Sequence, residues 1–193
     1  MAILKIARMG HPTLMRIADP ISDARAPAVQ QLVADMIDTM VDAPGIGLAA
    51  PQVHVPLRIV VFRVPDERGE DGEGVPLTVL INPEIEPLDD EMETGIEGCL
   101  SLPGMAGMVP RHTRIRYRAT GLDGEVFERT VEGYHARVVQ HECDHLDGIL
   151  YPMRMTDLST LGYAEEMSKS AEAGYNDDED DGDSEPHEAI DEQ

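Results

Sequence analysis

The sequence predicts an α+β fold in which antiparallel β-sheets pack around a central helix. Strand-like segments follow one another along the middle of the chain, and two of them are joined by a hairpin turn. Helical periodicity is strongest before and after these strands. The 193 residues suffice for one domain with a sizeable core, which low aromatic content makes mostly aliphatic.

The first expected helix covers residues 27–41, where apolar residues recur at helical spacing. Pro27 suits its first turn, and Pro44-Gly45 ends it. The small, glycine-rich segment over 45–52 follows directly.

Four strands are expected, because their segments are rich in Val and Ile or alternate polar with apolar residues. They cover residues 57–64, 77–85, 114–119 and 125–131. Residues 65–74 are polar and form a loop between the first two. Residues 121–124 form the hairpin turn between the last two.

Two further helices are expected near the end of the chain. One covers residues 133–146 and is closed by Gly148, and an amphipathic helix follows over 157–171. We expect residues 1–172 to form a single catalytic domain. Residues 173–193 are expected to be a disordered acidic tail, because they lack the apolar content to pack.

The charge balance limits the classes of partner. The formal net charge is −23, and ten acidic residues without any Lys or Arg lie in 176–193, which leaves −13 for the rest. This negative charge argues against a direct nucleic-acid partner, because it repels the phosphate backbone. No apolar run reaches the length of about 18 residues that a membrane span needs. The N-terminus resembles neither a secretory signal nor a transit peptide, so a cytoplasmic location is expected.

The tail itself has two interpretations. It can keep the protein solvated, or it can approach basic partners such as the ribosome surface.

The helix over 133–146 carries His141-Glu142-Cys143-Asp144-His145, an HExxH sequence. Residues four apart lie on one face of a helix, so both imidazoles can bind one metal ion. Glu142 can then act as a base on water. Cys143 points roughly 200° away from His141 and is expected to pack in the core. The alternative is a surface helix whose polar residues face water.

A catalytic metal of this kind usually has three protein ligands and a water molecule. A third His six residues after His145, as in metzincin proteases, is excluded because Tyr151 occupies that position. A carboxylate on a following helix, as in thermolysin-like proteases, could come from Glu165 or Glu166. A thiolate could come from Cys99, although a lone Cys is more typical of core packing. Spacing leaves the last two alternatives open.

Three segments together resemble, in order and spacing, the signature motifs of peptide deformylases. They are Gly45-Ile46-Gly47-Leu48-Ala49-Ala50-Pro51-Gln52, Glu97-Gly98-Cys99-Leu100-Ser101 and Gln140-His141-Glu142-Cys143-Asp144-His145. The resemblance covers most of residues 1–162 and excludes the tail. It implies a hydrolase of protein biosynthesis that removes the N-formyl group from the N-terminal methionine of nascent proteins and releases formate.

The resemblance also implies roles at the reaction centre. Cys99, His141 and His145 would bind the metal, with water in the fourth position. Glu142 would assist the attack of this metal-bound water, first as general base and then as acid.

The remaining implied roles concern the oxyanion and the peptide. The Gln52 side-chain amide and the Leu100 backbone N–H would stabilise the oxyanion. Residues of a groove would pair with the peptide as an added strand or enclose the methionine side chain. These substrate-binding residues are Ile46, Gly47, Gly98, Tyr134 and Val138.

The identity of the metal is a separate question. Cys and His ligands in tetrahedral geometry are typical of zinc. The resemblance instead implies one Fe(II) ion per chain in the cell, with zinc, nickel or cobalt replacing it in preparations. One position departs from the family pattern: many bacterial members carry Arg seven residues after the ligand Cys, where this chain has Ala106. The departure puts in doubt a contact to the peptide beyond methionine.

Overall fold

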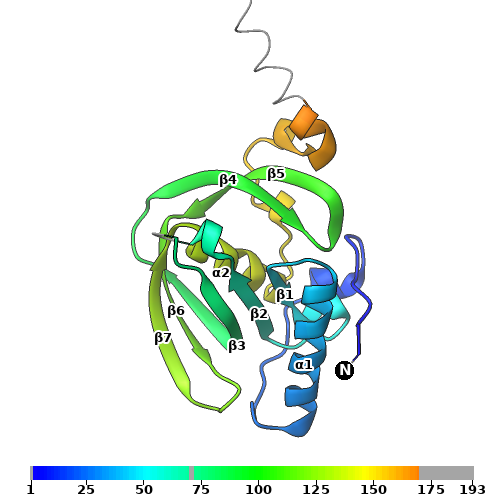
Figure 1. Ribbon diagram of the computed structural model, residues 1–193, viewed down its shortest axis with the longest axis vertical. Coiled ribbons are helices and arrows are strands. Elements are labelled where there is room, and N and C mark those ends of the chain that lie inside the picture. Colours follow the sequence, from blue (N-terminus) through cyan, green and yellow to red (C-terminus); the bar gives the residue numbers. More distant parts are fainter. Residues whose placement is uncertain (1, 70–71, 170–193) are drawn as a thin grey trace, which may run out of the picture.

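The computed structural model describes residues 2–69 and 72–169, which form two antiparallel sheets (Figure 1). The larger sheet has the strand order β1-β2-β3-β6-β7, and the smaller has the order β4-β5-β8. The strands are Gly47–Ala49 (β1), Ile59–Val64 (β2), Val75–Pro87 (β3), Met92–Cys99 (β4), Leu102–His112 (β5), Arg114–Thr120 (β6), Val126–Glu132 (β7) and Gly162–Tyr163 (β8). The predicted α+β class with antiparallel sheets is confirmed.

Two long helices accompany the sheets. They are α1 (Pro27–Asp42) and α2 (Gly133–Leu146), close to the predicted ranges. Helix α2 contacts β1 and β2 of the larger sheet and β5 of the smaller one (Figure 1). The short 3₁₀ helices are Pro12–Met15, Ala50–Val53, Asp66–Arg68, Tyr151–Met153 and Leu158–Thr160. No helix within residues 2–69 and 72–169 is both long and apolar enough to cross a membrane.

The two faces of the larger sheet bury separate sets of apolar side chains. One set packs α2 on the sheet and includes Phe62, Tyr117 and Cys143. The other packs α1 on the opposite side and includes Met36 and Met40. The expectation that Cys143 serves core packing is therefore confirmed. Burial raises the pKa of its thiol, which keeps it protonated.

The four predicted strands are present with slightly different ends. The first begins at Ile59 because Leu57 makes only an isolated bridge to Asp19. Strands β1, β4, β5 and β8 were not predicted. Seven of the eight β4 residues are partly or fully exposed and only Glu97 is buried, so no apolar alternation marks this strand.

The predicted helix over 157–171 is wrong for its first half. Asp157 accepts a hydrogen bond from the backbone of Ser159 and begins a 3₁₀ turn. Residues 162–163 then pair with Met105 and Ala106 as strand β8. The chain is helical only from residue 164 to residue 169, where the described part ends. Residues 170–171 and the acidic tail over 173–193 lie outside the described residues.

Candidate metal and active site

A pocket of about 720 Å³ is lined by residues of α2, β1, β4 and β5. All site residues expected from the sequence line it except His145, which lies behind it in the core. The lining residues among them are Ile46, Gly47, Gln52, Gly98, Cys99, Leu100, Tyr134, Val138, His141 and Glu142.

Three side chains in and behind this pocket form a cluster of potential metal ligands. The donor atoms of Cys99, His141 and His145 all lie within 4.8 Å of one another. Cys99 Sγ lies 3.4 Å from His145 Nε2, and the buried His145 Nδ1 has no hydrogen-bond partner among the described residues. One thiolate and two imidazoles suit a divalent transition-metal ion. The donor set therefore fits the expected metal.

The alternative third ligands lie elsewhere. Glu165 and Glu166 are exposed on the helical turn after β8, and both pair with Lys169 at 2.9 Å. Among the described residues, the only cluster of three potential ligands is the one with Cys99. The arrangement of a thermolysin-like peptidase is therefore not present.

Burial and charge set the protonation of the two imidazoles. Burial, together with the nearby charges of His141 and Arg111, holds the pKa of His145 well below its usual value. Burial also lowers the pKa of His141, but hydrogen bonds to Cys99 and Glu97 outweigh it and raise that pKa. A metal ion must therefore compete with a proton at His141, while His145 is already neutral.

Glu97, which sequence reasoning did not assign, orients one of these imidazoles. Its Oε2 lies 2.8 Å from His141 Nδ1, which leaves Nε2 of that ring for a metal. Arg111 donates two hydrogen bonds to Glu97, at 2.9 and 3.0 Å, and Arg137 donates one at 3.0 Å. Burial raises the pKa of Glu97, but the bonds from Arg111 and His141 outweigh it and lower the pKa to about 2.

Arg111 extends this network to helix α2. Its guanidinium donates to Asp144 at 2.6 Å, and Arg154 donates two further bonds to the same carboxylate. Residues of β4, β5 and α2 are thus tied together behind the pocket. Glu97 and Asp144 stand inside the sequence motifs, and their place next to proposed ligands is the signal that could have indicated a supporting role. Arg111 lies outside the motifs, and no sequence pattern indicated its role.

Gln52 is held in one orientation beside Cys99. Its Oε1 accepts a hydrogen bond from Ala49 N–H at 2.8 Å, so its Nε2 must be the donor. That Nε2 lies 3.5 Å from Cys99 Sγ and 3.2 Å from Ser101 Oγ. The side chain is buried, so its amide is a preorganised donor at the ligand cluster.

Glu142 is buried beside β1, and its Oε2 has no partner among the described residues. Burial raises its pKa to about 7, which the neighbouring His141 opposes only in part. Gly47 allows this position, because a Cβ on residue 47 would lie 2.1 Å from Glu142 Oε1. The missing side chain is therefore what lets the carboxylate reach the pocket.

Tyr134 and Ala106 also line the pocket. Arg68 donates a hydrogen bond to the Tyr134 hydroxyl at 2.7 Å and stacks over its ring. Ala106 is buried and lies opposite Gly98 of β4 and Gly162 of β8.

Comparison with known proteins identifies the family of this chain. The family model of polypeptide deformylases matches residues 3–160. "Peptide deformylase 2" of Ralstonia nicotianae is 51% identical over 91% of this chain and 99% of its own length. "Peptide deformylase 1" of Bordetella pertussis is 52% identical over 83% of this chain and 92% of its own.

Solved structures agree. A Met-Ala-Ser-bound class I type b peptide deformylase from Acinetobacter baumannii has a TM-score of 0.74 and 38% identity, covering 80% of this chain and 99% of its own. The peptide deformylase of Ehrlichia chaffeensis has a TM-score of 0.74 and 29% identity, covering 93% and 99%. The chain therefore belongs to the polypeptide deformylase family.

Proposed function

We propose that this chain is a metal-dependent hydrolase that removes the N-formyl group from the N-terminal methionine of nascent proteins and releases formate. One observation carries the proposal: a potential metal-ligand cluster, a buried carboxylate and a fixed amide donor converge at one pocket. The family membership supports the same reaction.

Cys99, His141 and His145 would hold the metal ion. A divalent cation bound there would supply Lewis acidity that makes water more acidic and polarises the formyl oxygen. We propose Fe(II) in the cell, with zinc, nickel or cobalt accepted in preparations. Because thiolates oxidise readily, protein with iron should lose activity in air unless Cys99 is protected.

Glu142 would move the proton. Its carboxylate accepts a proton from the attacking water and later delivers it to the departing nitrogen. A pKa of about 7 suits both tasks, because near neutral pH the group is ionised in about half of the molecules and can both accept and return a proton.

Gln52 and Leu100 would stabilise the oxyanion. The Gln52 Nε2 donor is fixed by its own Oε1 bond to Ala49, so it needs no reorganisation when charge develops. The Leu100 backbone N–H, directly after Cys99, is proposed as the second donor.

The peptide would lie along the pocket as an added strand. Ile46, Gly47 and Gly98 would contact its backbone, and Tyr134 and Val138 would enclose the methionine side chain. The Acinetobacter baumannii relative was solved with Met-Ala-Ser bound, a peptide of the same kind as the expected product.

N-formyl-Met nascent peptides are therefore the proposed partners. A cytoplasmic location, a contact with the ribosome surface and the absence of a direct nucleic-acid partner stay predictions.

Formate release from formyl-Met-Ala-Ser tests the proposal. Protein is prepared without oxygen, with iron or nickel, and acetyl-Met-Ala-Ser and an internally cleavable peptide serve as controls. We expect rapid release from the formyl peptide only. Cleavage of the internal peptide instead, or bound metal with no turnover, would contradict the proposed reaction.

A further inference from the structure

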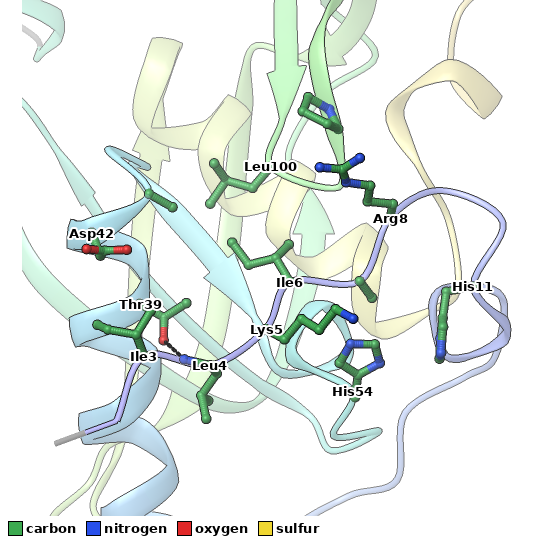
Figure 2. Close-up of a pocket in the computed structure, with 13 residues that line it drawn as sticks. Ile3, Leu4, Lys5, Ile6, Arg8, His11, Thr39, Asp42, His54 and Leu100 are labelled. Carbon is green, nitrogen blue, oxygen red and sulfur yellow. Dashed lines mark hydrogen bonds between the residues drawn. The ribbon is translucent and has the colours of Figure 1, made fainter.

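A second pocket, of about 790 Å³, lies beside the N-terminal segment (Figure 2). Its lining contains Lys5, Arg8 and the imidazoles of His11 and His54, against a single carboxylate, Asp42. Asp42 lies at the end of the pocket away from Arg8, His11 and His54 (Figure 2). One end of the pocket is therefore rich in cationic and hydrogen-bonding groups, although the protein as a whole is strongly acidic.

The two cations at this end are available to a ligand. Lys5 and Arg8 are exposed, and neither pairs with a carboxylate within the described residues. Some other arginines do so, such as Arg16 with Asp19 and Arg116 with Glu86. The rings of His11 and His54 meet edge to face, with centroids 4.5 Å apart, and close one side of the pocket.

The N-terminal segment is fixed relative to the catalytic pocket. Ala7 N–H donates to the Gln52 carbonyl at 2.7 Å, and Met9 N–H donates to the Ser101 carbonyl at 2.8 Å. These bonds flank Arg8 on both sides. The backbone at Arg8 is thus tied to the two residues that also contact Cys99 Sγ.

The two pockets share part of their lining. Leu100 and Pro103 line both of them, and Leu100 directly follows Cys99. An extended peptide advances about 3.3 Å per residue. A substrate whose methionine lies in the catalytic pocket can therefore pass over Leu100 and Pro103 with the next few residues.

We propose that the N-terminal pocket is a carboxylate-binding extension of the substrate groove. It selects formylated peptides that carry Asp or Glu a few residues after methionine, through Lys5 and Arg8. This proposal rests on the proposed deformylase activity. The chain's own acidic tail is the competing occupant, and the lining that this pocket shares with the catalytic pocket at Leu100 and Pro103 favours the substrate.

The test is a substrate series in which one Glu is moved through positions three, four and five of a formyl-Met-Ala-based pentapeptide. The matched peptide with Gln at the same position is the reference. We expect kcat/KM for the Glu peptide to exceed that for the Gln peptide by about 3- to 10-fold at one position, because exposed charge pairs contribute modestly. The gain lies in KM, since the contact exists equally in the ground and transition states.

The variant K5Q/R8Q separates this contact from the general charge of the protein. R114Q/R118Q is the matched control, because it removes two exposed charges from β6 that line neither pocket. The ratio of kcat/KM for the Glu peptide to that for the Gln peptide should fall to about one in K5Q/R8Q and stay at its wild-type value in the control. It should also weaken at 1 M salt, where the screening length is about 3 Å.

Formyl-Met-Ala, which is too short to cross Leu100, keeps the two proposals distinguishable. Its hydrolysis should be the same in wild type and K5Q/R8Q; no hydrolysis in any protein would contradict the deformylase function itself. Equal kcat/KM for Glu and Gln peptides at all positions, or a preference that survives K5Q/R8Q, would overturn the extension. A preference that emerges only after removal of residues 170–193 would also overturn it, because the tail would then be the occupant.

Discussion

Helix α2 and strand β4 supply opposite sides of one site, and they are held in different ways. Helix α2 packs a continuous apolar face on the larger sheet, and its functional residues follow at fixed helical spacing. Strand β4 is mostly exposed and is positioned by pairing with β5 and by the buried carboxylate of Glu97. The position of Cys99 thus depends on distant residues, whereas the spacing of His141 and Glu142 is set by the helix itself.

The junction between these two regions is an ion network rather than an apolar interface. Glu97 of β4 and Asp144 of α2 share Arg111 of β5. On the helix side, a change at Glu142, which is not one of the proposed ligands, should therefore affect chemistry with the metal retained. Changes on the strand side should affect metal binding and stability together.

The largest effect is expected from Glu142→Gln on the helix side. Loss of the proton acceptor should lower kcat by about 10²- to 10⁴-fold without loss of metal. Formate release and metal content are measured together, with Glu165→Gln on the exposed helical turn as control. Turnover within twofold of wild type would remove Glu142 from the mechanism.

Gly47→Ala tests the space that lets Glu142 reach the pocket. The new Cβ would lie 2.1 Å from Glu142 Oε1, so the carboxylate must move. A displacement of this size should lower kcat/KM by about 10²-fold while the metal stays bound. Gly162→Ala is the control, since its Cβ would meet Met167 at an ordinary 3.5 Å. Equal kinetics for both variants would show that the close approach does not matter.

Glu97→Gln should break the junction itself. Arg111 and Arg137 would lose their shared carboxylate, so the free energy of unfolding should fall by about 3–5 kcal/mol. Metal affinity should fall about 10- to 100-fold, because His141 loses its partner. Denaturant unfolding and a metal titration measure the two losses.

Glu86→Gln is the matched control for this change. It removes a carboxylate that pairs with an arginine on the exposed surface, and it should change the free energy of unfolding by less than about 1 kcal/mol. If both variants lose equally little stability and metal affinity, the buried network does not hold the two regions together.

The smallest effect concerns His135, at the start of α2. Burial, with the nearby charge of Arg129, lowers its pKa to about 4 from an ordinary 6.5. Between these values the unfolded chain binds a proton that the folded chain excludes, so this residue makes stability fall as the pH falls from 6.5 to 4. His135→Gln should make melting temperature less dependent on pH in this window. An unchanged dependence would show that His135 titrates normally.

The same contrast explains how far the sequence could predict the structure. Helices α1 and α2 were predicted because apolar periodicity and end signals are local. Strands β4 and β5 were missed because glycines and prolines interrupt their sequences. Strand β4 also lacks the alternation of buried and exposed residues that marks a half-buried strand. Their pairing, which brings Cys99 to the helix, depends on contacts that no local pattern encodes.

The residues of the candidate site divide in the same way, into those that a local pattern predicts and those that depend on distant contacts. The HExxH spacing alone placed His141, Glu142 and His145, whereas the assignment of Cys99 over Glu165 needed the resemblance of whole motifs. Arg111 could not have been found from the sequence, because its role arises only where β5 crosses behind the pocket. The helix over 157–163 was wrongly expected because Asp157 begins a 3₁₀ turn and residues 162–163 pair with β5.

Metal content measured alongside formate release in wild type, Cys99→Ala and Glu165→Ala tests the central claim most directly. We expect one metal ion per chain and full turnover in wild type and Glu165→Ala. Cys99→Ala should lose most of its metal and its activity, because the third ligand is removed. A Cys99→Ala protein that keeps its metal and its turnover would contradict the assigned centre.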